Sequence, residues 1–305
     1  MIELVLNDND YKLFSTLVSL NQKELKVLMT KYLQSKYENI IIHKKYLVAI
    51  GDIPIALVAH MDTVFKYPVI DLYYDRQKNV LWSPDGLGAD DRSGVFAIIK
   101  IIQSGLRPSI ILTTDEELGG IGASALVENY LNCPIPDLKY MIELDRQGHN
   151  DCVFYDCYNL QFVDYIKEFG FEEQYGSFSD ISFLMEDWNI CAVNLSVGYE
   201  NEHSYCEILH VNSLFSTIEK VKKMLQEKDI PDFEYVSYRA LFPIRYCDNC
   251  KKVFYEYELI PVNNKVKYYC PDCVKDKVNW CEKCGEAFET TTDPAKKLCV
   301  KCVEG

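Results

Sequence analysis

Apolar residues recur along most of the chain at two alternating spacings. Over 25–33 they repeat every three or four positions, as on one face of a helix, and Asn21 with Glu24 forms the pattern of a capping box ahead of them. The helical spacing returns at 95–102 and at 214–225. Around these segments lie five apolar runs of strand length, at 46–50, 55–59, 110–113, 140–144 and 191–195. The pattern predicts helices that alternate with short strands.

The five predicted strands share a feature that indicates how their sheet is covered. They lack the alternation of apolar and polar residues that is typical of a sheet with one face in water. Because helical segments separate them, the strands can run parallel with the helices packed against the sheet. We therefore predict an α/β fold with a doubly wound, mostly parallel sheet and helices on both faces.

The end of the chain has a different composition. Eight of the thirteen cysteines lie in the last 59 residues, in four Cys-x-x-Cys pairs: Cys247/Cys250, Cys270/Cys273, Cys281/Cys284 and Cys299/Cys302. The charge changes at the same point: residues 1–239 hold 21 Lys and Arg against 36 Asp and Glu, a net −15, and residues 240–305 hold 11 against 10, a net +1. We therefore predict two domains, 1–239 and 240–305.

Length, composition and charge exclude several classes of protein. A chain of 305 residues with 48% hydrophobic and 26% charged residues is typical of a globular protein. No apolar run approaches the roughly 18 residues of a membrane helix, and no secretory signal is visible. We therefore expect a cytoplasmic protein that does not bind a membrane, with cysteines that are thiols and metal ligands. The net charge of −14 argues against a nucleic-acid partner, which requires a basic surface.

Side chains that can bind metal ions stand where the predicted strands end. Directly or after a short loop, four strands run into acidic residues or histidines: His60 and Asp62, Glu116 and Glu117, Asp145, and His203. Asp90 lies in a glycine-containing segment that enters the predicted helix near Gly94. Because the carboxyl ends of parallel strands form one edge of a sheet, these side chains can converge there. Imidazole nitrogens and carboxylate oxygens suit zinc.

Taken in order, these motifs resemble those of a known group of enzymes. The motifs are His60-x-Asp62, Gly88-Ala-Asp90-Asp91-Arg-Ser-Gly94, Asp115-Glu116-Glu117-x-Gly119, Glu143-x-Asp145-Arg146 and Gly198-Tyr199-x3-His203-Ser204-x2-Glu207. As a set they resemble the co-catalytic di-zinc peptidases, which include leucyl and tetrahedral aminopeptidases with carboxypeptidase and deacylase relatives. The resemblance covers residues 10–228.

The resemblance implies two co-catalytic zinc ions, with cobalt or manganese as alternative metals. Five ligands are implied: His60 and Asp145 on one ion, Glu117 and His203 on the other, and Asp90 as a bridge between both. The resemblance also implies that Glu116 is the general base and that the peptide bond between Asp90 and Asp91 is cis.

Elementary chemistry supports these roles for the acidic residues. Two zinc ions that share a water lower its pKa and polarise a scissile carbonyl. The water also needs a proton acceptor that is not a ligand, and Glu116 can serve because its neighbour Glu117 takes the ligand role. Asp62 can accept the far N–H of His60 and so fix its tautomer.

Two segments are shorter than in the relatives. Carboxypeptidase-type relatives insert a lid or dimerisation domain where this chain has only 57 residues between Asp145 and His203. Tetrahedral aminopeptidases insert a small β-domain where only 27 residues separate Asp62 from Asp90. We therefore expect a minimal catalytic domain. Asp180, in a segment that the tetrahedral enzymes use near substrate, is a candidate for contact with substrate, and a helix N-cap is the alternative.

The cysteine pairs predict two structural zinc sites in a double zinc ribbon. Four-cysteine sites form most simply from pairs in sequence order: Cys247, Cys250, Cys270 and Cys273, then Cys281, Cys284, Cys299 and Cys302. Interleaved pairing remains open. A segment this short cannot build a core alone, so zinc would supply the folding energy. Eight thiolates and two zinc ions change its formal charge from +1 to about −3, which favours a protein partner or self-association over nucleic acid.

We therefore expect a cytoplasmic di-zinc metallopeptidase that resembles aminopeptidases. Its reaction would be the hydrolysis of peptide bonds that removes N-terminal residues from short peptides. One alternative is an N-acyl amino-acid or peptide deacylase, or a carboxypeptidase, of the same superfamily. Another is a non-catalytic zinc-ribbon interaction protein, against which the intact Glu116 argues.

Overall fold

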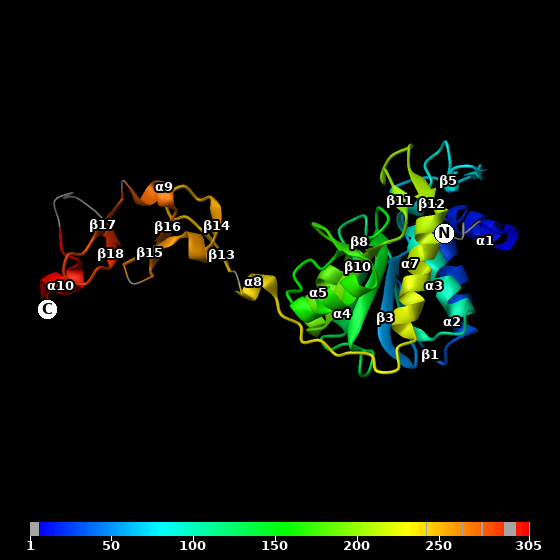
Figure 1. Cartoon of the computed structure of the whole chain (residues 1–305), viewed down its shortest axis with the longest axis horizontal. Coiled ribbons are helices and arrows are strands. Elements are labelled where there is room, and N and C mark those ends of the chain that lie inside the picture. The colour runs from blue at the N-terminus through cyan, green and yellow to red at the C-terminus, as the bar shows by residue number, and fades with distance from the viewer. Residues whose placement is uncertain (1–5, 242, 264, 276, 290–296, 305) are drawn as a thin grey trace. The chain divides into compact units, whose positions relative to one another are not determined.

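A mixed sheet of eight strands organises the first part of the chain in the computed structural model (Figure 1). The structure describes residues 6–241, 243–263, 265–275, 277–289 and 297–304. The chain divides into two compact units, Met1–Val236 (unit 1) and Ser237–Gly305 (unit 2). This division falls three residues before the boundary that the sequence predicts after Arg239.

The four central strands of the sheet are parallel, and the next strand on each side pairs antiparallel with them. In spatial order the strands are β1 (Asn39–Ile42), β2 (Tyr46–Ile50), β6 (Pro108–Thr113), β3 (Ile53–His60), β7 (Tyr140–Arg146), β10 (Cys191–Ser196), β8 (Asp151–Val153) and β9 (Glu172–Glu173). β6, β3, β7 and β10 pair in parallel. β2 pairs antiparallel with β6, and β8 with β10. All five predicted strands are present, and the predicted mostly parallel sheet is confirmed.

Helices cover both faces of this sheet. Those of unit 1 are α1 (Asp8–Val18), α2 (Gln22–Gln34), α3 (Ala89–Gln103), α4 (Ile121–Asn129), α5 (Leu160–Glu168), α6 (Asp180–Trp188) and α7 (Val211–Leu225). α3 and α7 lie on one side of the sheet, and α4 and α5 lie on the other (Figure 1). α2 begins at the predicted capping box of Asn21 and Glu24. The helices explain the apolar strands, since every residue from Ile55 to Ala59 in β3 is buried.

A second, smaller sheet lies in the same unit. Its four antiparallel strands, in spatial order, are β11 (Tyr199–Glu200), β12 (Ile208–His210), β5 (Val80–Trp82) and β4 (Tyr73–Asp75). The segment between Asp62 and Asp90 therefore contributes the hairpin of β4 and β5. The loop between β11 and β12 carries His203, so this sheet positions one residue of the candidate site.

The described residues of unit 2 form three short hairpins. Its strands are β13 (Ile244–Tyr246), β14 (Val253–Tyr255), β15 (Ile260–Val262), β16 (Lys267–Tyr269), β17 (Val278–Trp280) and β18 (Ala287–Glu289). They are accompanied by α8 (Tyr238–Leu241), the 3₁₀ helix η1 (Glu256–Glu258), α9 (Pro271–Val274) and α10 (Val300–Glu304). Its two small apolar clusters contain cysteines themselves, among them Cys247 and Cys299.

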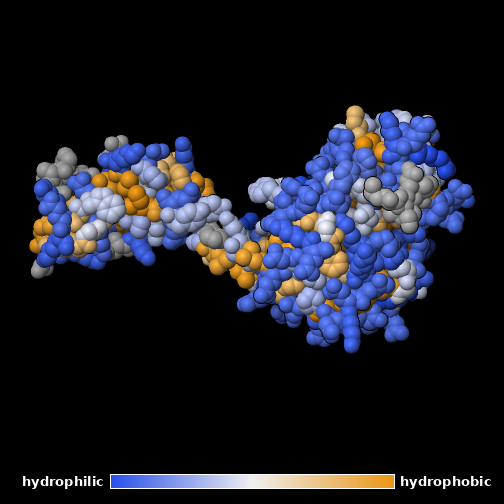
Figure 2. All heavy atoms as spheres, viewed as in Figure 1, coloured by the Kyte–Doolittle hydropathy of each residue, from blue (hydrophilic) through white to orange (hydrophobic). Residues whose placement is uncertain are grey.

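The surface of the two units differs in polarity. The visible face of unit 1 is mostly hydrophilic, whereas apolar residues form patches on the visible face of unit 2 (Figure 2). The exposed apolar side chains of unit 2 include Tyr246, Tyr257, Val266 and Trp280. Among the residues that the structure describes, no helix combines the length and the apolar character needed to cross a membrane.

Candidate metal centre and active site

The sheet brings the predicted site residues to one edge of unit 1. His60 ends β3, Glu116 and Glu117 follow β6, and Asp145 is the last residue but one of β7. These three strands are parallel neighbours, so their carboxyl ends meet. Asp90 enters from the first turn of α3, and His203 from the loop between β11 and β12.

Asp90 lies between the two imidazoles of this cluster. Its Oδ1 lies 3.0 Å from Nε2 of His60, and its Oδ2 lies 3.2 Å from Nε2 of His203. One carboxylate thus directs a different oxygen to each histidine, which is the arrangement of a bridging ligand.

Each histidine also lies beside a second carboxylate. Asp145 Oδ1 is 3.6 Å from Nε2 of His60, and Glu117 Oε2 is 3.0 Å from Nε2 of His203. The side chains are therefore grouped as the resemblance pairs them, with His60 beside Asp145 and Glu117 beside His203. Their role as metal ligands is a proposal that these distances support.

Asp62 organises three neighbouring groups from beneath the cluster. Its Oδ1 lies 3.2 Å from Nδ1 of His60, on the side of the ring away from Asp90. The backbone N–H groups of Glu116 and Glu117 donate to its two oxygens, each at 3.1 Å. Asp62 thus orients an imidazole and the dipeptide that carries the candidate base.

The entrance to α3 is held by residues that flank Asp90. The peptide bond between Asp90 and Asp91 is cis, as the resemblance predicts. Asp91 is completely buried, and its carboxylate accepts from the backbone N–H of His60 at 3.1 Å and of Gly94 at 2.8 Å. Glu207 accepts from the backbone N–H of Asp90 at 3.0 Å. Glu207 belongs to one of the quoted motifs, but its role could not be inferred from sequence because it depends on the loop between β11 and β12.

Burial and mutual repulsion shift the pKa values of the cluster. Burial raises the pKa of Glu116 to about 7 and that of Glu117 to about 6, and the charge of Asp90 adds to both. Burial and the same neighbour raise the pKa of Asp145. Burial lowers the pKa of His60, but the carboxylates around it, Asp145 first, outweigh burial and raise it well above 6.5.

The donor set fits a pair of divalent cations. Several buried carboxylates repel one another here, and two cations would remove the repulsion that raises their pKa values. Metal bonds of 2.0–2.1 Å in a tetrahedral site place ligand atoms about 3.3–3.4 Å apart. The contacts of His60 with Asp90 and Asp145, at 3.0 and 3.6 Å, lie on either side of that value.

Glu116 differs from the other carboxylates in its position. Its Oε2 lies 4.0 Å from Nε2 of His60, farther than either Asp90 or Asp145. It lines a cleft of about 390 Å³ together with Glu117, Glu202, Arg146 and other residues. A carboxyl group in this position can exchange a proton with a molecule in the cleft.

Asp180 lies beneath the cluster and is completely buried. The hydroxyl of Thr113 donates to its Oδ2, and its Oδ1 is buried without a hydrogen-bond partner. Burial raises its pKa to about 7; the hydrogen bond from Thr113 opposes this shift and the charge of Glu116 adds to it. The helix N-cap of α6 is Ser179, so Asp180 is the first helical residue rather than the cap. Contact of Asp180 with substrate stays a prediction.

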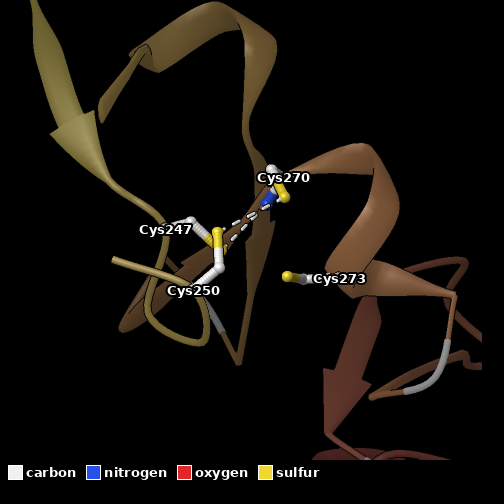
Figure 3. A group of neighbouring side chains, drawn as sticks. All are labelled: Cys247, Cys250, Cys270 and Cys273. Carbon is white, nitrogen blue, oxygen red and sulfur yellow. Dashed lines mark hydrogen bonds between the residues drawn. The ribbon is translucent and has the colours of Figure 1, made fainter. Parts of the chain in front are cut away.

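The eight cysteines of unit 2 form two separate groups of four. Cys247, Cys250, Cys270 and Cys273 make one group, with their side chains directed toward a common centre (Figure 3). Cys281, Cys284, Cys299 and Cys302 make the other. Each group joins two pairs that are consecutive in the sequence, so the structure supports the sequential pairing over the interleaved one.

The sulfur positions fit tetrahedral zinc. Zn–S bonds of 2.3 Å place two sulfurs about 3.8 Å apart, and the Cys250–Cys270 and Cys284–Cys299 sulfurs are 3.9 and 3.7 Å apart. Burial raises the pKa of Cys247, but backbone N–H groups, first that of Cys250, outweigh it and lower the pKa to about 6. A backbone N–H of Cys299 likewise lowers the pKa of Cys281 to about 6. Both shifts favour the thiolate that a zinc site needs.

Comparison with known proteins identifies the fold of unit 1. No protein-family model and no curated protein matches the chain. A tripeptidase from Staphylococcus aureus subsp. aureus Mu50 is 14% identical with a TM-score of 0.60, over 73% of this chain and 99% of that one. Aminopeptidase PepT from Bacillus cereus ATCC 10987 is 16% identical with a TM-score of 0.56, over 71% and 97%.

A third solved structure belongs to the tetrahedral type. The TET aminopeptidase from the marine sediment archaeon Thaumarchaeota archaeon SCGC AB-539-E09 is 13% identical with a TM-score of 0.57, over 73% of this chain and 98% of that one. The chain therefore has the fold of these aminopeptidases. The resemblance that the motifs indicate is confirmed at the level of the fold.

Proposed function

We propose that unit 1 is a di-zinc metallopeptidase, an exopeptidase that removes N-terminal residues from short peptides. The observation that carries this proposal is the position of Asp90, whose two oxygens lie 3.0 and 3.2 Å from two different imidazoles. A free carboxyl group, Glu116, stands beside this bridge in the same cleft. The aminopeptidase fold supports the same conclusion.

Five side chains would hold the two ions: His60 and Asp145 one of them, Glu117 and His203 the other, and Asp90 both. When bound, two divalent ions lower the pKa of a shared water and polarise the carbonyl of the scissile bond. Zinc suits these donors, and cobalt or manganese can replace it. Asp62 fixes the orientation of His60 through the contact of 3.2 Å at Nδ1.

Glu116 would move the proton in this reaction. It accepts a proton from the attacking water and passes it to the nitrogen of the leaving amine. Burial is the main cause that raises the pKa of Glu116, and burial favours the protonated carboxyl group that passes the proton to the leaving amine. Asp62 holds the backbone N–H of Glu116 at 3.1 Å and so fixes where the carboxyl can reach.

We propose Glu202 as the group that binds the free α-amine of the substrate. Among the acidic residues that line the cleft, Asp90, Glu117 and Asp145 are assigned to the ions and Glu116 to the proton. Glu202 remains available there, whereas Asp180 is completely buried. A carboxylate forms a charge-assisted hydrogen bond with an ammonium group, which salt screens less than long-range attraction. Glu202→Gln should therefore raise KM for free peptides with little change in kcat.

The test uses a matched pair of peptides, one with a free N-terminus and one N-acetylated. Each is assayed at equal concentration with the full chain in the presence of zinc, cobalt or manganese. We expect release of single N-terminal residues from the free peptide only. Faster hydrolysis of the acetylated peptide would replace this proposal with the deacylase alternative, and no hydrolysis of either with any metal would favour the non-catalytic alternative.

We propose that unit 2 holds two structural zinc ions and contributes to self-association. The exposed Tyr246, Tyr257 and Trp280 are side chains that suit a protein interface. One solved structure with this fold is described as a Pyrococcus horikoshii TET1 peptidase that can assemble into a tetrahedron or a large octahedral shell. A cytoplasmic location agrees with the thirteen cysteines, none of which forms a disulfide in the structure.

A further inference from the structure

Three side chains from separate segments meet outside the cluster around Asp90. His149 lies in the loop after β7, Glu200 in β11, and His210 at the end of β12. Nε2 of His149 is 3.1 Å from Oε1 of Glu200, and Nε2 of His210 is 3.4 Å from Oε2 of the same carboxylate. One donor atom from each of the three lies within 4.8 Å of the other two. This group therefore has the composition of a metal site.

The distances agree with the geometry of a bound transition metal ion. Ligand atoms with bonds of 2.0–2.2 Å in a tetrahedral site lie about 3.3–3.5 Å apart. The Nε2 atoms of His149 and His210 lie 3.1 and 3.4 Å from different oxygens of Glu200, so each imidazole stands close to this spacing from one carboxylate oxygen. A small rotation of these side chains would bring one oxygen of Glu200 and both Nε2 atoms around one ion, since the three donor atoms already lie within 4.8 Å of one another and the ring centroids of the two imidazoles are 4.8 Å apart. Two imidazoles and one carboxylate suit zinc and leave the fourth position to a water.

The other ring nitrogen of His149 has the partner that a metal-bound histidine needs. Its Nδ1 lies 2.7 Å from the hydroxyl of Ser213, in the first turn of α7. Such a contact fixes the tautomer that leaves Nε2 free to bind an ion. A simple ion pair between His149 and Glu200 would form without the contact between Nδ1 and Ser213, whereas a metal-bound histidine typically has such a partner.

His210 supplies a second, independent observation. Its Nε2 is buried from solvent and has no hydrogen-bond partner, although Glu200 lies at 3.4 Å. A buried polar atom without a partner costs free energy unless another group satisfies it. An ion held between His210 and Glu200 would satisfy this nitrogen.

The backbone of the three segments is tied together beneath the group. Gly148 N–H donates to the carbonyl of Tyr199 at 2.8 Å, and the N–H of Gly198 donates to the carbonyl of Gly148 at 3.0 Å. The N–H of His210 donates to the carbonyl of Gly198 at 2.8 Å. Gly198 has a φ of +92°, and a Cβ there would lie 2.7 Å from the carbonyl oxygen of His210. The sequence thus places a glycine where two backbone segments approach closely, and these contacts hold the backbone that carries the three side chains.

We propose that His149, Glu200 and His210 bind one transition metal ion, such as Zn²⁺, in addition to the four ions proposed for the chain. Glu200 ends β11, directly before the loop that carries His203 and Glu207. An ion on Glu200 would anchor the base of this loop to the loop after β7. The site does not depend on the proposed peptidase function, because its occupancy is measured by metal content and not by turnover.

The experiment measures zinc per chain by elemental analysis on the full chain, purified with excess zinc and then freed of unbound metal. The double variant His149→Ala/His210→Ala should contain one zinc fewer than the natural chain. His43→Ala is the matched control, because His43 is the remaining histidine outside both groups and is half-buried on the surface of unit 1. The control should keep the full metal content.

Two milder variants protect the test against misfolding of the double variant. Ser213→Ala removes only the contact with Nδ1 and should weaken zinc binding at one site by about 10- to 100-fold in a competition titration. Glu200→Gln keeps the shape of the side chain and removes the charge, and should also weaken that site. Circular dichroism reports whether each variant is folded. Full metal content in the folded double variant, or unchanged zinc affinity in Ser213→Ala and Glu200→Gln, would overturn the proposal in favour of a metal-free ion pair.

Discussion

Asp62 shows how one buried carboxylate can determine the geometry of several functional groups. It touches His60 at the ring nitrogen and the backbone of Glu116 and Glu117. These hydrogen bonds lower the pKa of Asp62 although burial acts in the opposite direction. The carboxylate therefore stays ionised, and it holds the histidine and the candidate base in a fixed relation.

The first prediction concerns Glu116. Glu116→Gln keeps the size of the side chain and its backbone contact with Asp62 but removes the proton acceptor. Loss of a general base typically lowers the rate about 10²- to 10⁴-fold, so kcat should fall by that factor. The measurement is peptide hydrolysis together with zinc content, which should stay unchanged.

Glu117→Gln is the matched control for that variant. Glu117 lies 3.0 Å from His203, so the neighbouring substitution should lower the affinity for metal as well as the rate. Near-normal turnover in Glu116→Gln would remove Glu116 from the proposed mechanism.

The second prediction concerns the buried Asp180, whose pKa is raised from 3.8 to about 7. An acid with a raised pKa in the folded state binds its proton more tightly there than in the unfolded chain. The stability that this proton contributes is complete below about pH 4 and is lost as the pH rises to about 7. Because one pKa unit corresponds to about 1.36 kcal/mol, the loss is on the order of 4 kcal/mol.

Asp180→Asn removes this titration while the amide oxygen can still accept the hydrogen bond from Thr113. The variant should therefore gain stability relative to the natural chain between pH 5 and pH 8, measured as the free energy of unfolding in urea. Asp187→Asn, at an exposed position of the same helix, is the control and should show little change. If Asp180→Asn differed in stability from the natural chain by the same amount at pH 5 and at pH 8, the raised pKa of Asp180 would be contradicted.

At the scale of elements, α3 sets the position of Asp90 by packing directly on β7. Gly94 is the point of closest approach: a Cβ there would lie 2.2 Å from the carbonyl oxygen of Leu144 and 2.5 Å from Oδ1 of Asp91. A backbone carbonyl in a central strand cannot move aside. Glycine at this position is therefore a packing requirement of the helix and strand.

The third prediction follows from this contact. Gly94→Ala gains up to about 1 kcal/mol of helix propensity but forces the start of α3 away from β7. Overpacking of this kind typically costs about 1–3 kcal/mol, so the variant should unfold at a lower urea concentration. The displacement also reaches Asp91, which binds the N–H of Gly94, so metal affinity at the centre should fall.

Gln103→Ala, at the exposed end of the same helix, is the control for that prediction. Surface substitutions away from special contacts usually change stability by less than about 0.5 kcal/mol. If Gly94→Ala were as stable as Gln103→Ala, the close packing of α3 on β7 would not constrain the fold.

The elements that the sequence predicts are those with a strong local signal. β3, β6, β7 and β10 are long apolar runs, and α2 and α7 have a clear helical spacing, so each was recognisable alone. β5 and β12 could not be recognised because each has only three residues. Their pairing joins Trp82 to Ile208, which is a contact between distant parts of the chain.

The same distinction explains which functional residues could be found. His60, Glu117 and Asp145 follow strongly predicted parallel strands, so their meeting at one edge was predictable. Glu207 and the group of His149, Glu200 and His210 depend on the short strands β11 and β12. Sequence spacing carries no information about where that hairpin lies.

At the scale of the whole chain, the two units rest on different kinds of core. Unit 1 has one large apolar cluster that includes fully buried side chains such as Phe14, Leu57, Ile142 and Val193. The clusters of unit 2 are small, and they include Cys247, Cys270, Cys281 and Cys299 among their buried members. In unit 2 the proposed zinc ligands and the core are therefore largely the same residues.

The last prediction uses this difference to test whether the units fold independently. Cys270 is almost completely buried in unit 2 and lies 3.9 Å from the sulfur of Cys250. Cys270→Ser should remove one zinc ion per chain, and because bound zinc supplies folding energy to domains of this size, it should make unit 2 sensitive to protease. Unit 1 should remain resistant, since its core contains none of these four ligands.

The control is Cys206→Ser at an exposed cysteine of unit 1, which should leave zinc content and both units unchanged. The measurement is limited proteolysis with mass spectrometry of the fragments. If unit 2 of Cys270→Ser resisted the protease, zinc would not be what stabilises its fold. If unit 1 of the same variant were digested, the two units would not fold independently.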